Sequence, residues 1–196
     1  MTGFEIAAFP TLTTERLILR EVVATDAEDL LVFRGDPEVQ QYNLVPIRSA
    51  AEARRLVKTM QAWYSTGYAI QWGITLRDEH RVLGLCGLHE WNRTHRRASV
   101  GYDLARSHWG QGIATEAMRA VLRFGFEELD LNRVEALTIA ENARSIRLLE
   151  RLGFQREGVR RDLWLEADGS FRSSAIYSLL RSEHSFEATD ASHETG

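Results

Sequence analysis

One stretch, SVGYDLARSHWGQGIATEAM at residues 99–118, constrains the fold most, because it reads as a strand, a glycine-rich loop and a helix. Gly110 and Gly112 have no Cβ, so successive backbone N–H groups of the loop can close on an anion. A helix beginning near Thr115 would direct the positive end of its dipole there, which also suits Glu116. The stretch predicts a phosphate-binding loop; the alternative is a strand-to-helix turn whose glycines serve geometry alone.

Two better-known phosphate loops do not fit this stretch. The P-loop has Lys followed by Ser or Thr after its last glycine, and this chain has Ile113 and Ala114 there. The dinucleotide-binding fingerprint GxGxxG needs a third glycine, where this chain has Thr115. ATP hydrolysis and NAD-dependent chemistry are therefore disfavoured.

The loop resembles the acyl-CoA loop of the GNAT N-acetyltransferases: Gln or Arg, two residues, Gly, one residue, then Gly or Ala. Gly112 and Ala114 match the last two positions. Trp109 replaces Gln or Arg, as in the WGxGxATEA wording of the Rim-type branch, the ribosomal-protein N-terminal acetyltransferases. A second block, NARSIRLLERLGF at 142–154, resembles the family's helix beside the pantetheine arm. The resemblance extends over about residues 12–183.

Length and composition agree with one globular domain. The chain has 196 residues, of which 44% are hydrophobic and 27% charged, enough for a single core. We expect one domain over residues 1–183 and a flexible tail over 184–196, where small and polar residues dominate. The formal net charge of −4 disfavours a nucleic-acid binder.

Cysteine usage and hydropathy point to the cytoplasm. Cys86 is the single cysteine, so no intrachain disulfide can form, and neither a secretory leader nor a membrane-length apolar run is evident. We therefore expect a cytoplasmic protein without membrane contact. Cys86 lies between Leu85 and Gly87 in an apolar strand, which favours a buried structural cysteine over a nucleophile.

Hydrophobic periodicity and turn signals predict a mixed-sheet α/β (α+β) domain. The expected strands cover 15–22, 68–76, 81–91, 97–105, 133–140, 154–167 and 171–180, the last two forming a hairpin with an Asp-Gly turn. The expected helices cover 26–34, 49–64, 115–129 and 142–152. This order is what the GNAT acyl-CoA N-acyltransferase fold implies: a central mixed sheet flanked by helices, with the strands at about 98–105 and 133–140 splayed apart.

The resemblance implies acetyl-CoA as co-substrate and no metal. The pantetheine arm would enter the gap between the splayed strands and pair with backbone near Asp103 and Leu104. Asn142 would bind the same arm, a role compatible with its use as a helix N-cap. The diphosphate would lie on the backbone amides of Gln111, Gly112, Ile113, Ala114 and Thr115.

The reaction that the resemblance implies is direct attack of a neutral amine on the thioester. With reference pKa values of about 7.7–8.0 for an α-amine and about 10.4 for lysine, an α-amine needs the weaker base. We assign that role to Glu90, at the end of the strand LGLCGLHE, with His89 and Asp103 as alternates; otherwise Glu90 is a solvated strand end. Strand alternation predicts that His89 faces away from Glu90.

The leaving thiolate and the acceptor each have a candidate residue. Many family members place a tyrosine acid seven residues after the Asn, but here Leu149 stands there. Ser145 resembles the Rim-type substitute, and because a thiol's pKa is only about 8.5, its expulsion as thiolate needs modest help. Tyr42 lies in the loop that shapes the family's acceptor cleft and is expected to line it.

These features together predict an acetyl-CoA-dependent N-acetyltransferase acting on a primary amine, either a protein or peptide α-amine or a small molecule. Two alternatives stay open. One is an acetyltransferase for antibiotics or amino acids. The other is a non-catalytic acyl-CoA sensor, because the tyrosine acid is missing. The expected partner is the amine acceptor, without nucleic acid or membrane, and the protein is expected to be a monomer or a homodimer.

Overall fold

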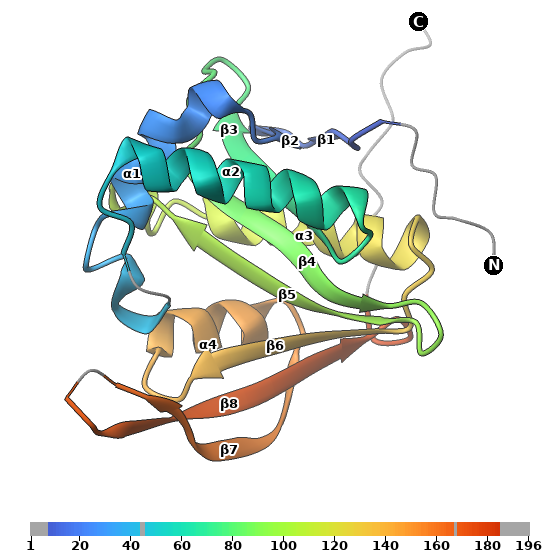
Figure 1. Ribbon diagram of the computed structural model, residues 1–196. Coiled ribbons are helices and arrows are strands. Elements are labelled where there is room, and N and C mark those ends of the chain that lie inside the picture. Colours follow the sequence, from blue (N-terminus) through green and yellow to red (C-terminus); the bar gives the residue numbers. More distant parts are fainter. Residues whose placement is uncertain (1–7, 44–45, 167, 185–196) are drawn as a thin grey trace, which may run out of the picture.

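The computed structural model describes residues 8–43, 46–166 and 168–184 (Figure 1). Its strands are β1 (Leu12–Thr13), β2 (Leu17–Glu21), β3 (Ala69–Leu76), β4 (Gly84–Asn92), β5 (Arg97–Leu104), β6 (Arg133–Ile139), β7 (Gln155–Leu165) and β8 (Phe171–Leu180). Its α-helices are α1 (Ala27–Arg34), α2 (Ala50–Ser65), α3 (Ile113–Glu127) and α4 (Ala143–Arg151). None of these helices has the length and apolar character needed to cross a membrane. The tail expected at 184–196 lies outside the described residues, except for His184, whose ring packs on Phe126.

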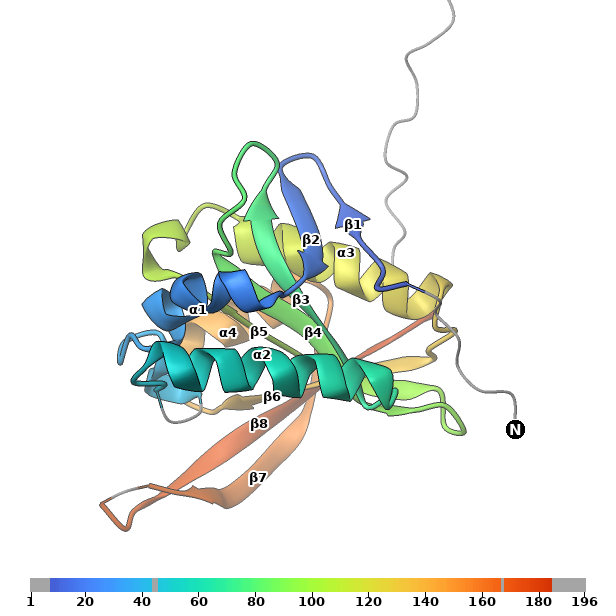
Figure 2. The same ribbon diagram turned by 45° about the horizontal axis from the view of Figure 1, so that its top comes forward.

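The strands form an eight-stranded sheet in the order β1-β2-β3-β4-β5-β6-β8-β7. Neighbouring strands are antiparallel except β5 and β6, which are parallel. Helices α1 and α2 cover one face of the sheet, and α3 and α4 cover the other (Figures 1 and 2). The expectation of a mixed sheet flanked by helices is confirmed.

The sheet opens between its two parallel strands. Residues Arg97–Ser99 of β5 pair with Arg133–Glu135 of β6, and the ladder ends there. Beyond this point the two strands diverge toward their carboxyl-terminal ends (Figure 1). The predicted splay is therefore present, and over its last residues the edge of β5 that faces β6 has no partner among the described strands.

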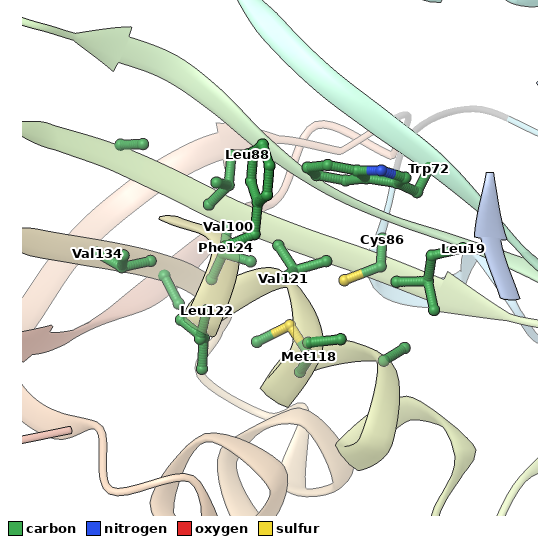
Figure 3. Close-up of a cluster of buried hydrophobic side chains, with 14 of the residues drawn as sticks. Leu19, Trp72, Cys86, Leu88, Val100, Met118, Val121, Leu122, Phe124 and Val134 are labelled. Atoms are coloured by element: carbon green, nitrogen blue, oxygen red, sulfur yellow. The ribbon is translucent and has the colours of Figure 1, made fainter. Parts of the chain in front are cut away.

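The larger hydrophobic core lies between the sheet and helices α3 and α4. Cys86 lies in it beside Met118 and Val121 (Figure 3). It is fully buried, and this burial raises the pKa of its thiol. Strand alternation sends Leu85 to the second core, under α1 and α2. These positions support the structural role that we expected for Cys86.

Several element boundaries differ from the sequence prediction by a few residues, and two of them have a visible cause. Helix α3 begins at Ile113 rather than near Thr115, because Ile113 is already buried in the core and Gly112, at φ +78°, makes the turn before it. Strand β4 begins at Gly84 rather than at 81, because the Val82 N–H donates to the Asp29 carboxylate at 3.0 Å instead of to a neighbouring strand. The short β1 was missed because two residues carry no periodicity.

Two glycines in β4 allow close approach of the neighbouring backbone. A Cβ at Gly84 would lie 2.4 Å from the Asp103 carbonyl oxygen, and one at Gly87 would lie 2.5 Å from the Ile70 carbonyl oxygen. The irregularity in this strand lies further along, between His89 and Asn92. The glycines therefore serve strand packing rather than the bulge.

Candidate active site

A cavity of about 900 Å³ opens where β5 and β6 part. Its walls come from the loop after α1, the diverging ends of both strands, the loop before α3, and α4. Within the described ranges, no group of three His, Cys, Asp or Glu side chains is placed to hold a metal. The expected site residues that line the cavity are Tyr42, Asp103, Leu104, Gly112, Ile113, Ala114, Thr115, Asn142 and Ser145.

The glycine loop presents the amino end of α3 to this cavity. Gly110 and Gly112 have φ values of +76° and +78°, which favour glycine. Gly112 is the N-cap, and no described side chain caps the helix there. The first N–H groups of an α-helix have no partner inside the helix, so those of its first turn remain available to an anion. The loop therefore has the geometry of an anion cradle.

Trp109, at the position where the resemblance implies Gln or Arg, ties the loop to neighbouring elements. Its indole Nε1 donates to the Leu104 carbonyl oxygen at 2.8 Å, which ties the loop to the end of β5. The Arg144 guanidinium of α4 lies over its ring, 4.2 Å from the centroid. Trp109 thus anchors the loop by one hydrogen bond and one cation–π contact.

Ser145 and Asn142 lie at the start of α4, beside a tyrosine that sequence reasoning missed. The Asn142 Oδ1 accepts the Ser145 N–H at 3.2 Å, so Asn142 is the N-cap of α4. The Ser145 side chain lies next to Tyr102 of β5; burial raises the pKa of Tyr102, and Ser145 opposes this rise. In the sequence, Tyr102 alternates with Asp103 and shares a strand face with Val100 and Leu104, and this pattern could have predicted which way its side chain points.

Glu90 and Gln111 are not among the described residues that line the cavity. Glu90 is exposed at the bulge of β4 with φ +52°, and it accepts a hydrogen bond from the Ser99 hydroxyl at 3.3 Å. The structure therefore does not bring Glu90 to the other candidate residues.

The expectation that His89 faces away from Glu90 is wrong. A Cβ at Gly101 would lie 2.8 Å from the His89 Nε2, and Gly101 shares a face of β5 with Ser99, the partner of Glu90. The bulge breaks the alternation and brings both side chains to one face. Burial lowers the pKa of His89 to about 4; Glu90 opposes this shift and Arg34 adds to it.

Asp103 is the candidate base that the structure does bring to the cavity. Its side chain is only 4% exposed, and its Oδ2 lies 2.7 Å from the Arg34 Nε. Burial raises the pKa of this carboxyl, whereas Arg34, Gln40 and the Leu85 amide oppose the rise. Arg34 ends α1, and its pairing across the fold with β5 leaves no local signal in the sequence.

The predicted acceptor-lining residue, Tyr42, is held in place by the last hairpin. Arg172 of β8 donates from Nη1 to the Gln41 carbonyl oxygen at 3.1 Å, and its guanidinium lies 5.8 Å from the centre of the Tyr42 ring. Glu38, in the same loop, lines the cavity and is ion-paired with Arg106. The wall on the side of α1 thus combines the Tyr42 ring with two carboxylates, Glu38 and Asp103, each of which is ion-paired with an arginine.

Comparison with known proteins agrees with this geometry. The model of the acetyltransferase (GNAT) domain matches residues 16–155. The chain is 39% identical over 175 residues to the "Uncharacterized N-acetyltransferase p20" of Bacillus licheniformis. The aligned region covers 89% of this chain and 98% of that protein. It is also 39% identical over 179 residues to the "Putative ribosomal N-acetyltransferase YdaF" of Bacillus subtilis (strain 168), covering 89% and 97% of the two chains.

A solved structure shows the same fold. It is that of RimL, a ribosomal L7/L12 alpha-N-protein acetyltransferase in complex with coenzyme A, with a TM-score of 0.79 and 21% identity. The match covers 87% of this chain and 98% of that one. Because the family model matches most of the length of this chain, the chain belongs to the GNAT family of acetyltransferases.

Proposed function

We propose that this N-acetyltransferase transfers the acetyl group of acetyl-CoA to the N-terminal α-amine of a protein or peptide. The observation that carries the proposal is a single cavity with three parts. They are the anion cradle before α3, the gap where β5 and β6 part beyond Ser99 (the open seam), and the wall formed by the loop at Tyr42 (the acceptor wall). The 39% identity to a protein named as a ribosomal N-acetyltransferase supports a protein acceptor. We also propose that the reaction takes place in the cytoplasm.

The proposed path of acetyl-CoA follows the cavity. The diphosphate lies on the backbone amides of the loop from Gln111 to Thr115, at the positive end of α3. The pantetheine arm runs along the open edge of β5 at Asp103 and Leu104, as an added strand would, with Asn142 beside it. The acetyl group then reaches the point where the cavity passes between the two strands.

For the proton acceptor we propose Asp103, with Glu90 as the second candidate. Asp103 lines the cavity and Glu90 does not, so Glu90 could act only through water beyond that lining. Because burial raises its pKa, Asp103 is a stronger base than an exposed carboxylate. An α-amine of pKa about 7.7–8.0 is partly neutral at pH 7 and needs no stronger base.

For the leaving thiolate we propose the Ser145 hydroxyl as hydrogen-bond donor. Ser145 lines the cavity one turn into α4, where its side chain meets Tyr102. A tyrosine next to the serine can support the developing negative charge through it, which compensates for Leu149 at the family's tyrosine position. We expect Ser145→Ala to lower kcat about tenfold while CoA affinity is unchanged.

An acceptor screen tests the proposed function. Release of free CoA thiol is measured with peptides bearing free N-termini, with N-terminally blocked lysine peptides, and with polyamines, amino acids and aminoglycosides. We expect the highest kcat/KM for free N-terminal peptides. Higher kcat/KM for a small amine would favour the antibiotic- or amino-acid-modifying alternative. Tight CoA binding without turnover of any amine would favour the acyl-CoA sensor.

A further inference from the structure

A hydrogen-bonded network ties the segment that leads into β2 to the loop before α3. The Arg16 Nη1 donates to the Gln111 carbonyl oxygen at 2.9 Å, and its Nε donates to the Glu116 Oε2 at 2.6 Å. The Glu116 Oε1 accepts the Arg16 N–H at 2.9 Å and the Thr14 hydroxyl at 2.6 Å. One guanidinium therefore holds both a loop carbonyl and the first-turn carboxylate of α3.

The held carbonyl decides where the neighbouring N–H points. The Gln111 carbonyl and the Gly112 N–H belong to one planar trans peptide, in which the two groups point in opposite directions. Because Arg16 takes the carbonyl, the Gly112 N–H is turned away from Arg16. Gly112 lines the cavity, so the network keeps a donor available to an anion and keeps a carbonyl dipole away from it.

We propose that Arg16 is a positioning residue for the diphosphate of acyl-CoA, acting by orienting the peptide between Gln111 and Gly112. This inference rests on the proposed placement of the coenzyme on the loop. Arg16 does not act as a phosphate ligand itself, because its charge is already balanced by Glu116 at 2.6 Å. Burial raises the pKa of Glu116, but hydrogen bonds from Thr14 and Arg16 outweigh this and hold it below its usual range.

Coenzyme binding to an Arg16→Gln variant tests the proposal, with CoA and pantetheine each titrated by NMR. Losing a charge-assisted hydrogen bond should weaken CoA binding roughly ten- to a hundredfold. Pantetheine has no diphosphate, so its affinity should stay the same. Arg20→Gln is the matched control, because Arg20 lies in β2 and pairs with Asp26 rather than with the loop. It should leave both affinities unchanged.

A Glu116→Gln variant separates positioning from direct charge attraction. Glutamine keeps one oxygen to accept from the Thr14 hydroxyl and the Arg16 backbone N–H, but it replaces the oxygen that accepts from the Arg16 Nε and removes the charge that balances the guanidinium. Positioning predicts CoA affinity within about threefold of the original protein, whereas a direct phosphate ligand, once released, would bind CoA more tightly. Tighter binding here, unchanged CoA affinity in Arg16→Gln, or an equal loss for pantetheine would overturn the proposal. Absence of CoA binding by the unaltered protein would instead overturn the coenzyme site itself.

Discussion

At the scale of single residues, the candidate bases show what local sequence can and cannot predict. The sequence offers Glu90, His89 and Asp103, because each is a titratable group in or after an apolar strand. Choosing among them depends on the β4 bulge and on the Arg34–Asp103 ion pair, which joins α1 to β5. Neither the bulge nor the ion pair can be recognised from the residues next to these candidates in the sequence.

An Asp103→Asn variant should lower kcat at least about a hundredfold, because general-base help typically contributes that much. Glu90→Gln should leave kcat within about twofold. The KM for acetyl-CoA should stay unchanged in both. Steady-state thiol release with a free N-terminal peptide checks this prediction, and the reverse order of the two effects would return the role to Glu90.

Folding is the control for that comparison, since the Asp103→Asn substitution would leave the Arg34 charge without its carboxylate. We expect a loss of about 3 kcal/mol in the free energy of unfolding. A second variant, Arg34→Gln, keeps the carboxylate and removes the cation that opposes the raised pKa of Asp103. Its acid limb in the pH profile of kcat/KM should move to higher pH; an unmoved limb would argue against Asp103 as the base.

His89 should make stability depend on pH. Its pKa is about 4 in the folded protein and about 6.5 when unfolded, so the unfolded chain binds more protons between these values. The free energy of unfolding is therefore highest above pH 6.5, where His89 is neutral in both states. It falls by up to about 3 kcal/mol as the pH drops toward 4. In urea unfolding at pH 7 and 4.5, His89→Gln should lose less stability than the unaltered protein; equal losses would contradict this.

At the scale of elements, the strand, loop and helix around residues 99–118 could be predicted because their signals are local. Glycine spacing marks the loop, and apolar periodicity marks α3. The starts of α3 and β4 were displaced because tertiary contacts, the burial of Ile113 and the Asp29 hydrogen bond, decide where regular structure begins. Tyr102 was missed because its partner, Ser145, lies on another element.

Gly112 and Gly169 form a matched pair for testing the loop. Both have positive φ, +78° and +84°, so alanine should cost about 1 kcal/mol of folding free energy at either position. Of the two, Gly112 lines the cavity and Gly169 does not. Gly112→Ala should weaken CoA binding at least about tenfold, and Gly169→Ala should not change it. Calorimetric titration with CoA, alongside thermal unfolding, checks both; equal CoA affinities would remove Gly112 from the site.

At the scale of the whole molecule, the open seam between β5 and β6 organises the site. The parallel ladder holds only at Arg97–Ser99, and the cavity in the gap beyond it joins the loop after α1 on one face with α3 and α4 on the other. This seam was predicted from family resemblance and not from composition or periodicity, because strand divergence is a property of the sheet. The acceptor wall depends on Arg172 meeting the Gln41–Tyr42 loop, a contact between distant segments that only the fold reveals.

A crystal structure of the protein with bound CoA tests the central claim most directly. We expect diphosphate oxygens within about 3.2 Å of the backbone nitrogens of the loop that ends at Thr115, and the thiol beside Ser145 in the seam. Coenzyme bound away from the amino end of α3, or loop N–H groups already bonded within the protein, would contradict the account.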